Sequence, residues 1–165
     1  MNFFVPTILA TSCISFAGPN IGQLDERLPK EMVPVISVPS LDYVSLFQED
    51  RERERAGQAP QFAVPFEESI TPATFGIWQR VDMNTQRWSL RVSCDNALSM
   101  NVGFGRYNMP ASGSMSITDA TGSFEIRAFT ADDNKSHGQL WTPVVPGGEA
   151  LIEITVNNSD RPLVD

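Results

Sequence analysis

The stretch that decides the fold is Arg87-Trp-Ser-Leu-Arg-Val-Ser93, in which polar and apolar residues alternate strictly. Because successive side chains of a β-strand point to opposite faces, this alternation predicts a strand whose buried face is formed by Trp88, Leu90 and Val92. A second alternating run follows the turn-forming pair Asp95-Asn96. Its apolar residues are Leu98, Met100, Val102 and Phe104. The two runs together predict a β-hairpin.

Short runs of the same period recur from Phe62 onward. They are closed by turn signals such as Gly113, Asp119-Ala-Thr-Gly122 and Pro146-Gly-Gly148. Several short strands at spacings of roughly eight to twelve residues, with no strong helix between them, predict an all-β fold, an antiparallel β-sandwich of jelly-roll type. The apolar positions that mark the further strands are Phe75, Ile77 and Val81; Met115 and Ile117; Phe124, Ile126 and Ala128; and Leu151 to Val156.

The first residues predict a secretory signal peptide. An apolar stretch from Phe3 to Phe16 overlaps Ser15-x-Ala17, a small-x-small pattern of the kind that signal peptidase accepts. The basic residue that usually precedes such a stretch is missing, so a buried N-terminal helix is an alternative. A lipoprotein signal that lipidates Cys13 is another. We expect residues 1–17 to be removed after Ala17 and the protein to be secreted or periplasmic, with no membrane association after cleavage.

Residues 18–60 change character twice. Prolines 29, 34 and 39 punctuate the first part, and a charged run from Gln48 to Arg55 forms the second. Glu and Arg residues in this run have helical neighbour spacing, which predicts a short exposed helix. We expect residues 18–60 to be an extended or partly helical linker that adds nothing to a core, and residues 61–165 to form the sandwich domain. Docking of the charged segment on a partner is an alternative.

Composition limits the possible partners. The chain has 165 residues and a net charge of −8, without a basic cluster, which argues against nucleic acid or an anionic membrane surface as partner. With the signal removed, roughly 150 residues suffice for one compact domain but not for a two-domain enzyme. Only Cys94 is then left, so no internal disulfide can form. We expect it to be a small buried residue rather than a reactive thiol.

The sequence lacks the set of residues that peptidase catalysis requires, and it predicts no metal cofactor. A serine protease needs a histidine base, an aspartate and a serine nucleophile, but the single histidine, His137, follows a run of turn formers. Zinc normally requires three or four His, Cys or carboxylate ligands. Asp132, Asp133 and Asn134 offer oxygens that suit calcium. Their spacing differs from that of a helix-loop-helix calcium site, and an Asx-type turn is favoured.

The chain has three tryptophans, and the exposure of their rings decides whether they form an aromatic surface for sugar binding. Trp88 alternates with core residues, which predicts burial. Trp78 is out of phase with Ile77, and Trp141 lies in the segment 130–149, which reads as an ordered loop packed on a sheet. Trp78 and Trp141 are therefore the candidates for an exposed aromatic surface that binds carbohydrate.

A series of short motifs runs in a fixed order over residues 49–156. They are Arg55-Ala-Gly-Gln-Ala-Pro60, Phe62-Ala-Val-Pro65, Ile70-Thr-Pro72, Gly76-x-Trp78, Trp88-Ser-Leu-Arg-Val92, Ala97-Leu-Ser-Met-Asn101, Gly103-Phe-Gly-Arg-Tyr107, Met109-Pro110, Ala131-Asp-Asp-Asn134, His137-Gly-Gln-Leu-Trp-Thr-Pro143 and Pro146-Gly147. In their order these motifs resemble the pro-region of secreted bacterial trypsin-like serine endopeptidases of the lysyl endopeptidase kind. The chain departs from that family by ending before any catalytic domain.

The resemblance implies that the chain is the targeting and pro part of a secreted serine endopeptidase precursor. Such a region assists folding of the trypsin-like catalytic domain, in cis or in trans, and keeps it inactive until cleaved. Arg53 and Arg55 are then candidate processing sites. The apolar pair Leu163-Val164 predicts the start of a strand, so we expect the chain to be the N-terminal part of a longer precursor. The alternative is a stand-alone secreted module that binds a carbohydrate or protein ligand.

Overall fold

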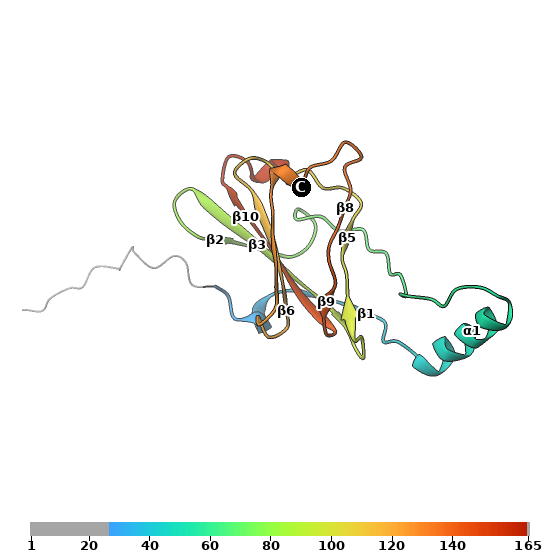
Figure 1. Ribbon diagram of the computed structural model, residues 1–165. Coiled ribbons are helices and arrows are strands. Elements are labelled where there is room, and N and C mark those ends of the chain that lie inside the picture. Colours follow the sequence, from blue (N-terminus) through green and yellow to red (C-terminus); the bar gives the residue numbers. More distant parts are fainter. Residues whose placement is uncertain (1–26, 165) are drawn as a thin grey trace, which may run out of the picture.

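The computed structural model describes residues 27–164, and its largest element is a six-stranded mixed sheet (Figure 1). The predicted signal peptide, its cleavage position at Ala17 and Cys13 lie outside the described residues. Strand order is β1-β3-β10-β6-β7, with β2 also paired to β3. The strands are β1 (Val35–Val38), β2 (Ile77–Arg80), β3 (Thr85–Cys94), β6 (Ser114–Asp119), β7 (Glu125–Phe129) and β10 (Glu149–Asn157).

Strand β3 organises this sheet. On one side it pairs antiparallel with β10 over nine residue pairs, from Glu149 opposite Ser93 to Asn157 opposite Thr85. On its other side β1 and β2 lie one after the other, β1 parallel and β2 antiparallel. The predicted buried face is confirmed for Trp88 and Leu90, and Val92 is half-buried. The β-rich class is confirmed, but the parallel pair of β1 and β3 differs from the purely antiparallel arrangement that we predicted.

The predicted hairpin between residues 87–93 and 98–104 is wrong. Residues 99–104 form two short strands, β4 (Ser99–Met100) and β5 (Gly103–Phe104), neither of which pairs with β3. They pair with β9 (Val145–Pro146) and β8 (Leu140–Trp141) in two separate ribbons. After β3 the chain leaves the sheet at Asn96. The φ of Asn96 is 66°, a left-handed conformation that asparagine adopts more readily than most residues. The place beside β3 is taken by β10, which forms a much longer ladder.

The two ribbons pack against the apolar face of the sheet (Figure 1). The core between them combines sheet residues with residues of the loop that follows β5 and of β9. Ile117, Val145 and Ala150 are fully buried there. Ile117 is distant in sequence from Val145 and Ala150, so the core depends on long-range contacts.

Helix α1 (Tyr43–Arg55) confirms the helix predicted for the charged run. Asp42 caps its N-terminus, because the Asp42 carboxylate accepts hydrogen bonds from the N–H groups of Val44 and Ser45. None of its residues is buried, and it projects from the body in Figure 1. No helix within residues 27–164 is long and apolar enough to cross a membrane.

The segment that we expected to add nothing to a core does contribute to the sheet. β1 lies within it, and Val33 just before β1 is buried. Pro34 and Pro39 flank the strand, so their missing N–H groups cost no ladder hydrogen bond. The Pro34 carbonyl accepts a hydrogen bond from Arg91 N–H at 2.9 Å.

The described part of the chain also contains three short 3₁₀ helices: η1 (Lys30–Met32), η2 (Ala131–Asp133) and η3 (Arg161–Leu163). The strand predicted to begin at Leu163 is wrong, because this residue ends η3. Pro162 stands at the start of that turn, where its fixed φ suits a helical turn.

Candidate binding cleft

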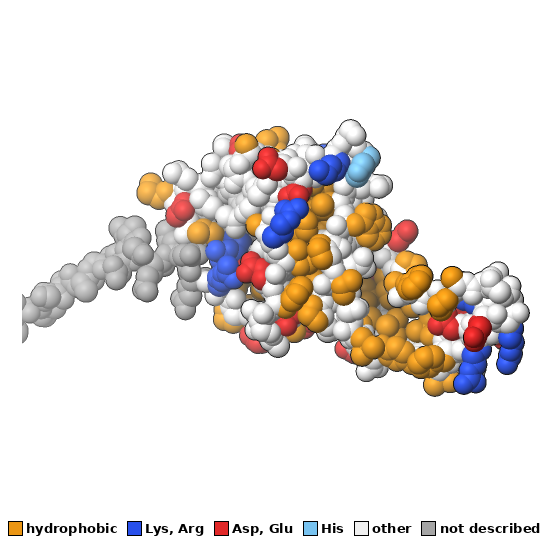
Figure 2. Space-filling model, viewed as in Figure 1, with side chains coloured by type: hydrophobic (Ala, Val, Ile, Leu, Met, Phe, Trp, Pro, Cys, Tyr) orange, Lys and Arg blue, Asp and Glu red, His pale blue; other side chains and the backbone are white. Residues whose placement is uncertain are grey.

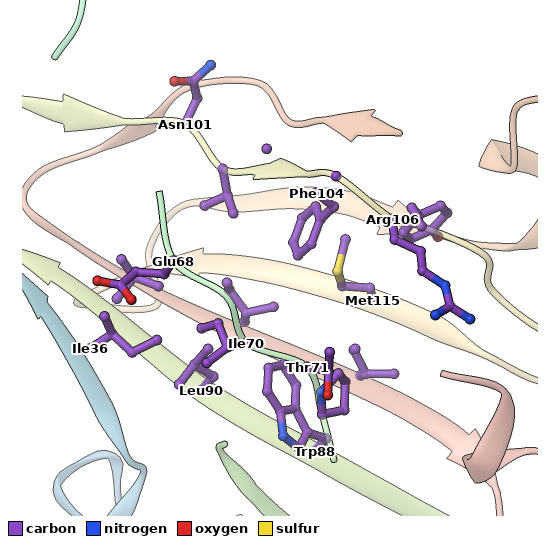
Figure 3. Close-up of a pocket in the computed structure, with 18 of the residues that line it drawn as sticks. Ile36, Glu68, Ile70, Thr71, Trp88, Leu90, Asn101, Phe104, Arg106 and Met115 are labelled. Atoms are coloured by element: carbon purple, nitrogen blue, oxygen red, sulfur yellow. The ribbon is translucent and has the colours of Figure 1, made fainter. Parts of the chain in front are cut away.

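An apolar cleft lies between the sheet and the ribbons, with a cavity of about 400 Å³. Trp88 and Leu90 of β3 form its floor, and Phe104 lies on the opposite wall (Figure 3). Val102, two residues before Phe104, also lines the cavity. These side chains alternate along their segments, so each contributes a face to the cleft. A cavity of this size with mostly apolar walls falls within the range of known ligand sites.

Residues 62–72, which we call the strap, cross this cleft. Phe66, Glu68 and Ile70 line the cavity. In Figure 3 the strap runs between the floor residues of β3 and the wall at Phe104. Pro65 and Pro72 fix φ and favour an extended residue before them, which keeps this segment out of a helix.

The strap is anchored at its two ends. Before it, the Gln61 N–H donates to Asp50 Oδ1 of α1 at 2.9 Å. At its end, Trp78 Nε1 donates to the Pro72 carbonyl at 3.0 Å. Among the described residues, no hydrogen bond joins residues 62–70 to the sheet or to the ribbons. The middle of the strap is therefore held by apolar contact alone.

Of the residues between 27 and 164 that line the cavity, two carry a charge, Arg106 and Glu68. They lie toward opposite ends of the cavity in Figure 3. Neither makes an ion pair or a side-chain hydrogen bond within residues 27–164. Both charges are thus available to a ligand.

The opposite face of the sheet is polar and holds the start of the described chain. Glu153 on β10 is only 7% exposed. Its Oε2 lies 3.2 Å from Arg27 Nη1, and its Oε1 lies 3.8 Å from Nε of the buried Arg87. Lys30 pairs with Glu149 at 2.9 Å. These ion pairs fix residues 27–30 against β10, away from the cleft.

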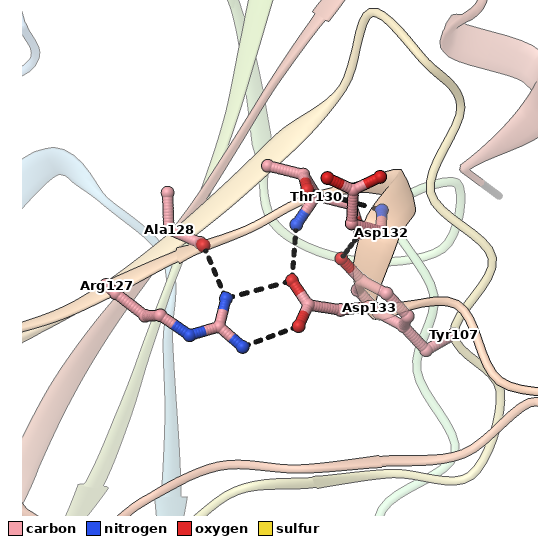
Figure 4. A network of polar contacts seen from close by, with 6 residues as sticks. All are labelled: Tyr107, Arg127, Ala128, Thr130, Asp132 and Asp133. Atoms are coloured by element: carbon pink, nitrogen blue, oxygen red, sulfur yellow. Dashed lines mark hydrogen bonds and ion pairs between the residues drawn. The ribbon is translucent and has the colours of Figure 1, made fainter.

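The predicted calcium ligands belong to a compact turn after β7 (Figure 4). The Asp133 carboxylate accepts hydrogen bonds from the Arg127 guanidinium and from Thr130 N–H. The hydrogen bond from Arg127 is the main cause that lowers the pKa of Asp133 to about 2. Asp132 is exposed. Within residues 27–164, no group of three or more His, Cys, Asp or Glu side chains is placed to hold a metal ion.

The third predicted ligand is Asn134, and both polar atoms of its side-chain amide make hydrogen bonds. Its Oδ1 accepts from Met109 N–H at 2.8 Å, and its Nδ2 donates to the Met109 carbonyl at 2.9 Å. Nearby, burial raises the pKa of Tyr107 to about 12, and its hydroxyl donates to the Thr130 carbonyl. These bonds fix the loop before β8 on the residues that follow β5.

His137 lies in an exposed turn, as its sequence context predicts. Its Nδ1 accepts a hydrogen bond from Gln139 N–H at 3.1 Å. No serine hydroxyl or carboxylate hydrogen-bonds to this imidazole within the described part of the chain. The arrangement is that of a structural turn.

The structure separates the three tryptophans. Trp88 is buried as predicted, and its Nε1 donates to the Phe75 carbonyl. Trp78 is half-buried, and the Arg161 guanidinium lies 4.6 Å from its ring centroid. Trp141 is 69% exposed and lies in a different sheet. The two predicted surface aromatics therefore do not share one sheet, and Trp78 has one ring face covered.

The two candidate processing sites lie away from the cleft, whereas Cys94 lines it. Arg53 and Arg55 are in the last turn of α1, and Arg55 is its final residue. Cys94 is buried as predicted, burial raises the pKa of its thiol, and it lines the cleft. Sequence reasoning missed the cleft because Val102 and Phe104 have the pattern of an ordinary core face. The proline-bounded pair Phe66 and Ile70 was the one available signal.

No protein-family model matches the sequence, and no solved structure matches the chain.

Proposed function

We propose that this chain is the non-catalytic pro-region of a secreted trypsin-like serine endopeptidase precursor and that it acts by binding the protease domain. The observation that carries the proposal is the apolar cleft, which the strap covers only loosely. Large apolar surface that is left open on a small domain is typical of a binding site for another molecule. The ordered motifs of residues 49–156 supply the class of partner.

Further apolar residues are exposed outside the cleft. Leu98 and Val144 are exposed near the ribbons, and Val44 and Phe47 are exposed on α1. Figure 2 shows hydrophobic side chains gathered over the body and along the part of the chain that leads to α1. A protein partner buries such surface, which offsets the cost of leaving it in water.

In this proposal residues 1–17 are the signal peptide and are removed after Ala17 on export. The sheet and the ribbons are the two layers of a jelly-roll sandwich. The protein is secreted or periplasmic, its partner is the trypsin-like domain in cis or in trans, and the segment around α1 is processed after Arg53 or Arg55. The pro-region contributes no catalytic residue and needs no cofactor.

Purified residues 18–165 mixed with the trypsin-like protease of the same organism test the proposal. We expect slower hydrolysis of a chromogenic lysyl substrate, or a higher yield of active protease on refolding, because the pro-region binds the folded domain. Bovine serum albumin at equal concentration is the control for non-specific effects. If neither rate nor yield changes, the pro-region function is wrong. Peptidase activity of residues 18–165 alone would also contradict it.

A second candidate is a stand-alone module that binds a carbohydrate or protein ligand, and the exposure of Trp141 favours it. An exposed indole stacks on a sugar ring through its apolar face. Glycan-array binding that is lost in Trp141→Ala, and kept in Trp78→Phe, would support this function. Absence of glycan binding removes the carbohydrate form of it.

A further inference from the structure

The strap occupies the cleft without filling it. Phe66 and Ile70 line the cavity, yet 42% and 36% of their surfaces are exposed. A cavity of about 400 Å³ stays open beside them. Apolar walls without contacting atoms lose dispersion energy, so an occupant that fills the cleft better is favoured over the strap.

The wall opposite β3 has a free backbone edge. Thr142 N–H donates to the Val102 carbonyl at 3.0 Å, and Thr142 Oγ1 accepts from Val102 N–H. Because neighbouring residues of a strand direct their backbone groups to opposite edges, those of Gly103 point to the other edge of the ribbon. The strap makes no hydrogen bond there within the described residues. An extended polypeptide can pair with such an edge.

We propose that the cleft binds one extended, apolar polypeptide segment of the protease partner, which displaces the middle of the strap and pairs with residues 101–105. This inference rests on the proposed function, because it names the surface by which the pro-region holds the protease. The strap shows which chemistry fits: an extended backbone with apolar side chains four positions apart, at Phe66 and Ile70. An added strand gains backbone hydrogen bonds that the strap lacks.

Charge defines one end of the segment. When the strap leaves, Glu68 leaves with it, and Arg106 is then the one charged residue among the described residues that line the cavity. Arg106 has no ion-pair partner within residues 27–164. A guanidinium pairs well with a carboxylate. The favoured occupant is therefore an apolar segment that carries a carboxylate at the Arg106 end.

The test uses residues 18–165 and a fluorescein-labelled peptide with the sequence of residues 62–70. We expect Phe66→Ser/Ile70→Ser to bind this peptide about tenfold more tightly than the unchanged chain, because the internal competitor is weakened. Fluorescence anisotropy measures the affinity. Phe62→Ser is the matched control, since Phe62 is exposed and does not line the cavity, and it should leave the affinity unchanged.

Two further variants locate the binding. Val102→Asp places a charge in the apolar wall and should abolish peptide binding, with circular dichroism melting to check the fold. The peptide with a free C-terminal carboxylate should bind more tightly than its amide. Arg106→Ala should remove that difference. Equal affinities for the double variant and the unchanged chain would overturn the proposal, as would binding of dodecanoate in the cleft without binding of the peptide.

Inhibition of the protease separates this inference from the proposed function. If the unchanged chain slows the protease and a folded Val102→Asp chain slows it equally, the pro-region function stands and the cleft inference is wrong. If the peptide binds but the chain has no effect on the protease, the pro-region function is wrong, and the assignment of the occupant to the protease falls with it. Loss of inhibition in Val102→Asp supports both.

Discussion

Arg127 of β7 and Asp133 of η2 form a bidentate ion pair at the start of the segment that joins β7 to β8. Arg127 Nη1 donates to Asp133 Oδ2 at 3.0 Å, and Nη2 contacts Oδ1 (Figure 4). The same Oδ2 accepts the Thr130 N–H at 2.9 Å, which closes a capping box at η2. The pair therefore fixes the turn from which the ordered loop starts.

This ion pair makes stability depend on acid pH. The pKa of Asp133 is lowered to about 2 from 3.8, so its contribution is fully present above pH 4 and is lost as the pH falls toward 2. Asp133→Asn should reduce the free energy of unfolding by about 1 kcal/mol at pH 7, because Arg127 is 66% exposed and the pair is screened by solvent. Urea unfolding at pH 7 and at pH 2.5 measures the difference. A difference that is as large at pH 2.5 would contradict the assignment.

A glycine in contact with Trp88 gives a prediction about the core. A Cβ on Gly76 would lie 2.2 Å from Trp88 Nε1, and the φ of Gly76 is 95°. Gly76→Ala should therefore destabilise the protein by about 3 kcal/mol, because the buried ring must move. Gly122→Ala is the matched control: its φ is also positive, but nothing lies within 4 Å of the added Cβ. Its cost should stay near 1 kcal/mol. Similar costs in chemical denaturation would count against close packing at Gly76.

Sequence patterns predicted β3 better than its neighbours. Alternation in residues 87–93 is a local property, and it gave the strand and its buried face correctly. Pairing is not local: the Asp95-Asn96 turn resembles a hairpin turn, while the strand that pairs with β3 over nine positions begins at Glu149. The cleft could not be predicted, because an apolar strand face looks the same in sequence whether it touches a core or a cavity.

The buried carboxylate of Glu153 supports a third stability prediction. It accepts a hydrogen bond from Ser89 and lies between Arg27 and the buried Arg87. Glu153→Ala should destabilise the fold by about 2 kcal/mol, because it removes the charged acceptor of Ser89 Oγ and the ion pairs with Arg27 and Arg87. The exposed Glu125 on β7 is the control, and Glu125→Ala should change stability by less than about 0.5 kcal/mol. Equal effects of the two variants on the melting temperature would show that the Glu153 pairs contribute little.

Limited trypsin digestion should cut first after Arg55. Arg55 is exposed at the end of α1, and irregular chain follows it, whereas Arg87 is buried. The fragment before the cut should stay bound, because β1 is paired with β3 and Lys30 with Glu149. We therefore expect two fragments in a denaturing gel and one peak in gel filtration. Arg55→Gln should slow the first cut, while Arg80→Gln, in β2, should not. Earlier cleavage within the sheet, or separation of the fragments without denaturant, would show that residues 27–38 are not held on the sheet as the structure describes.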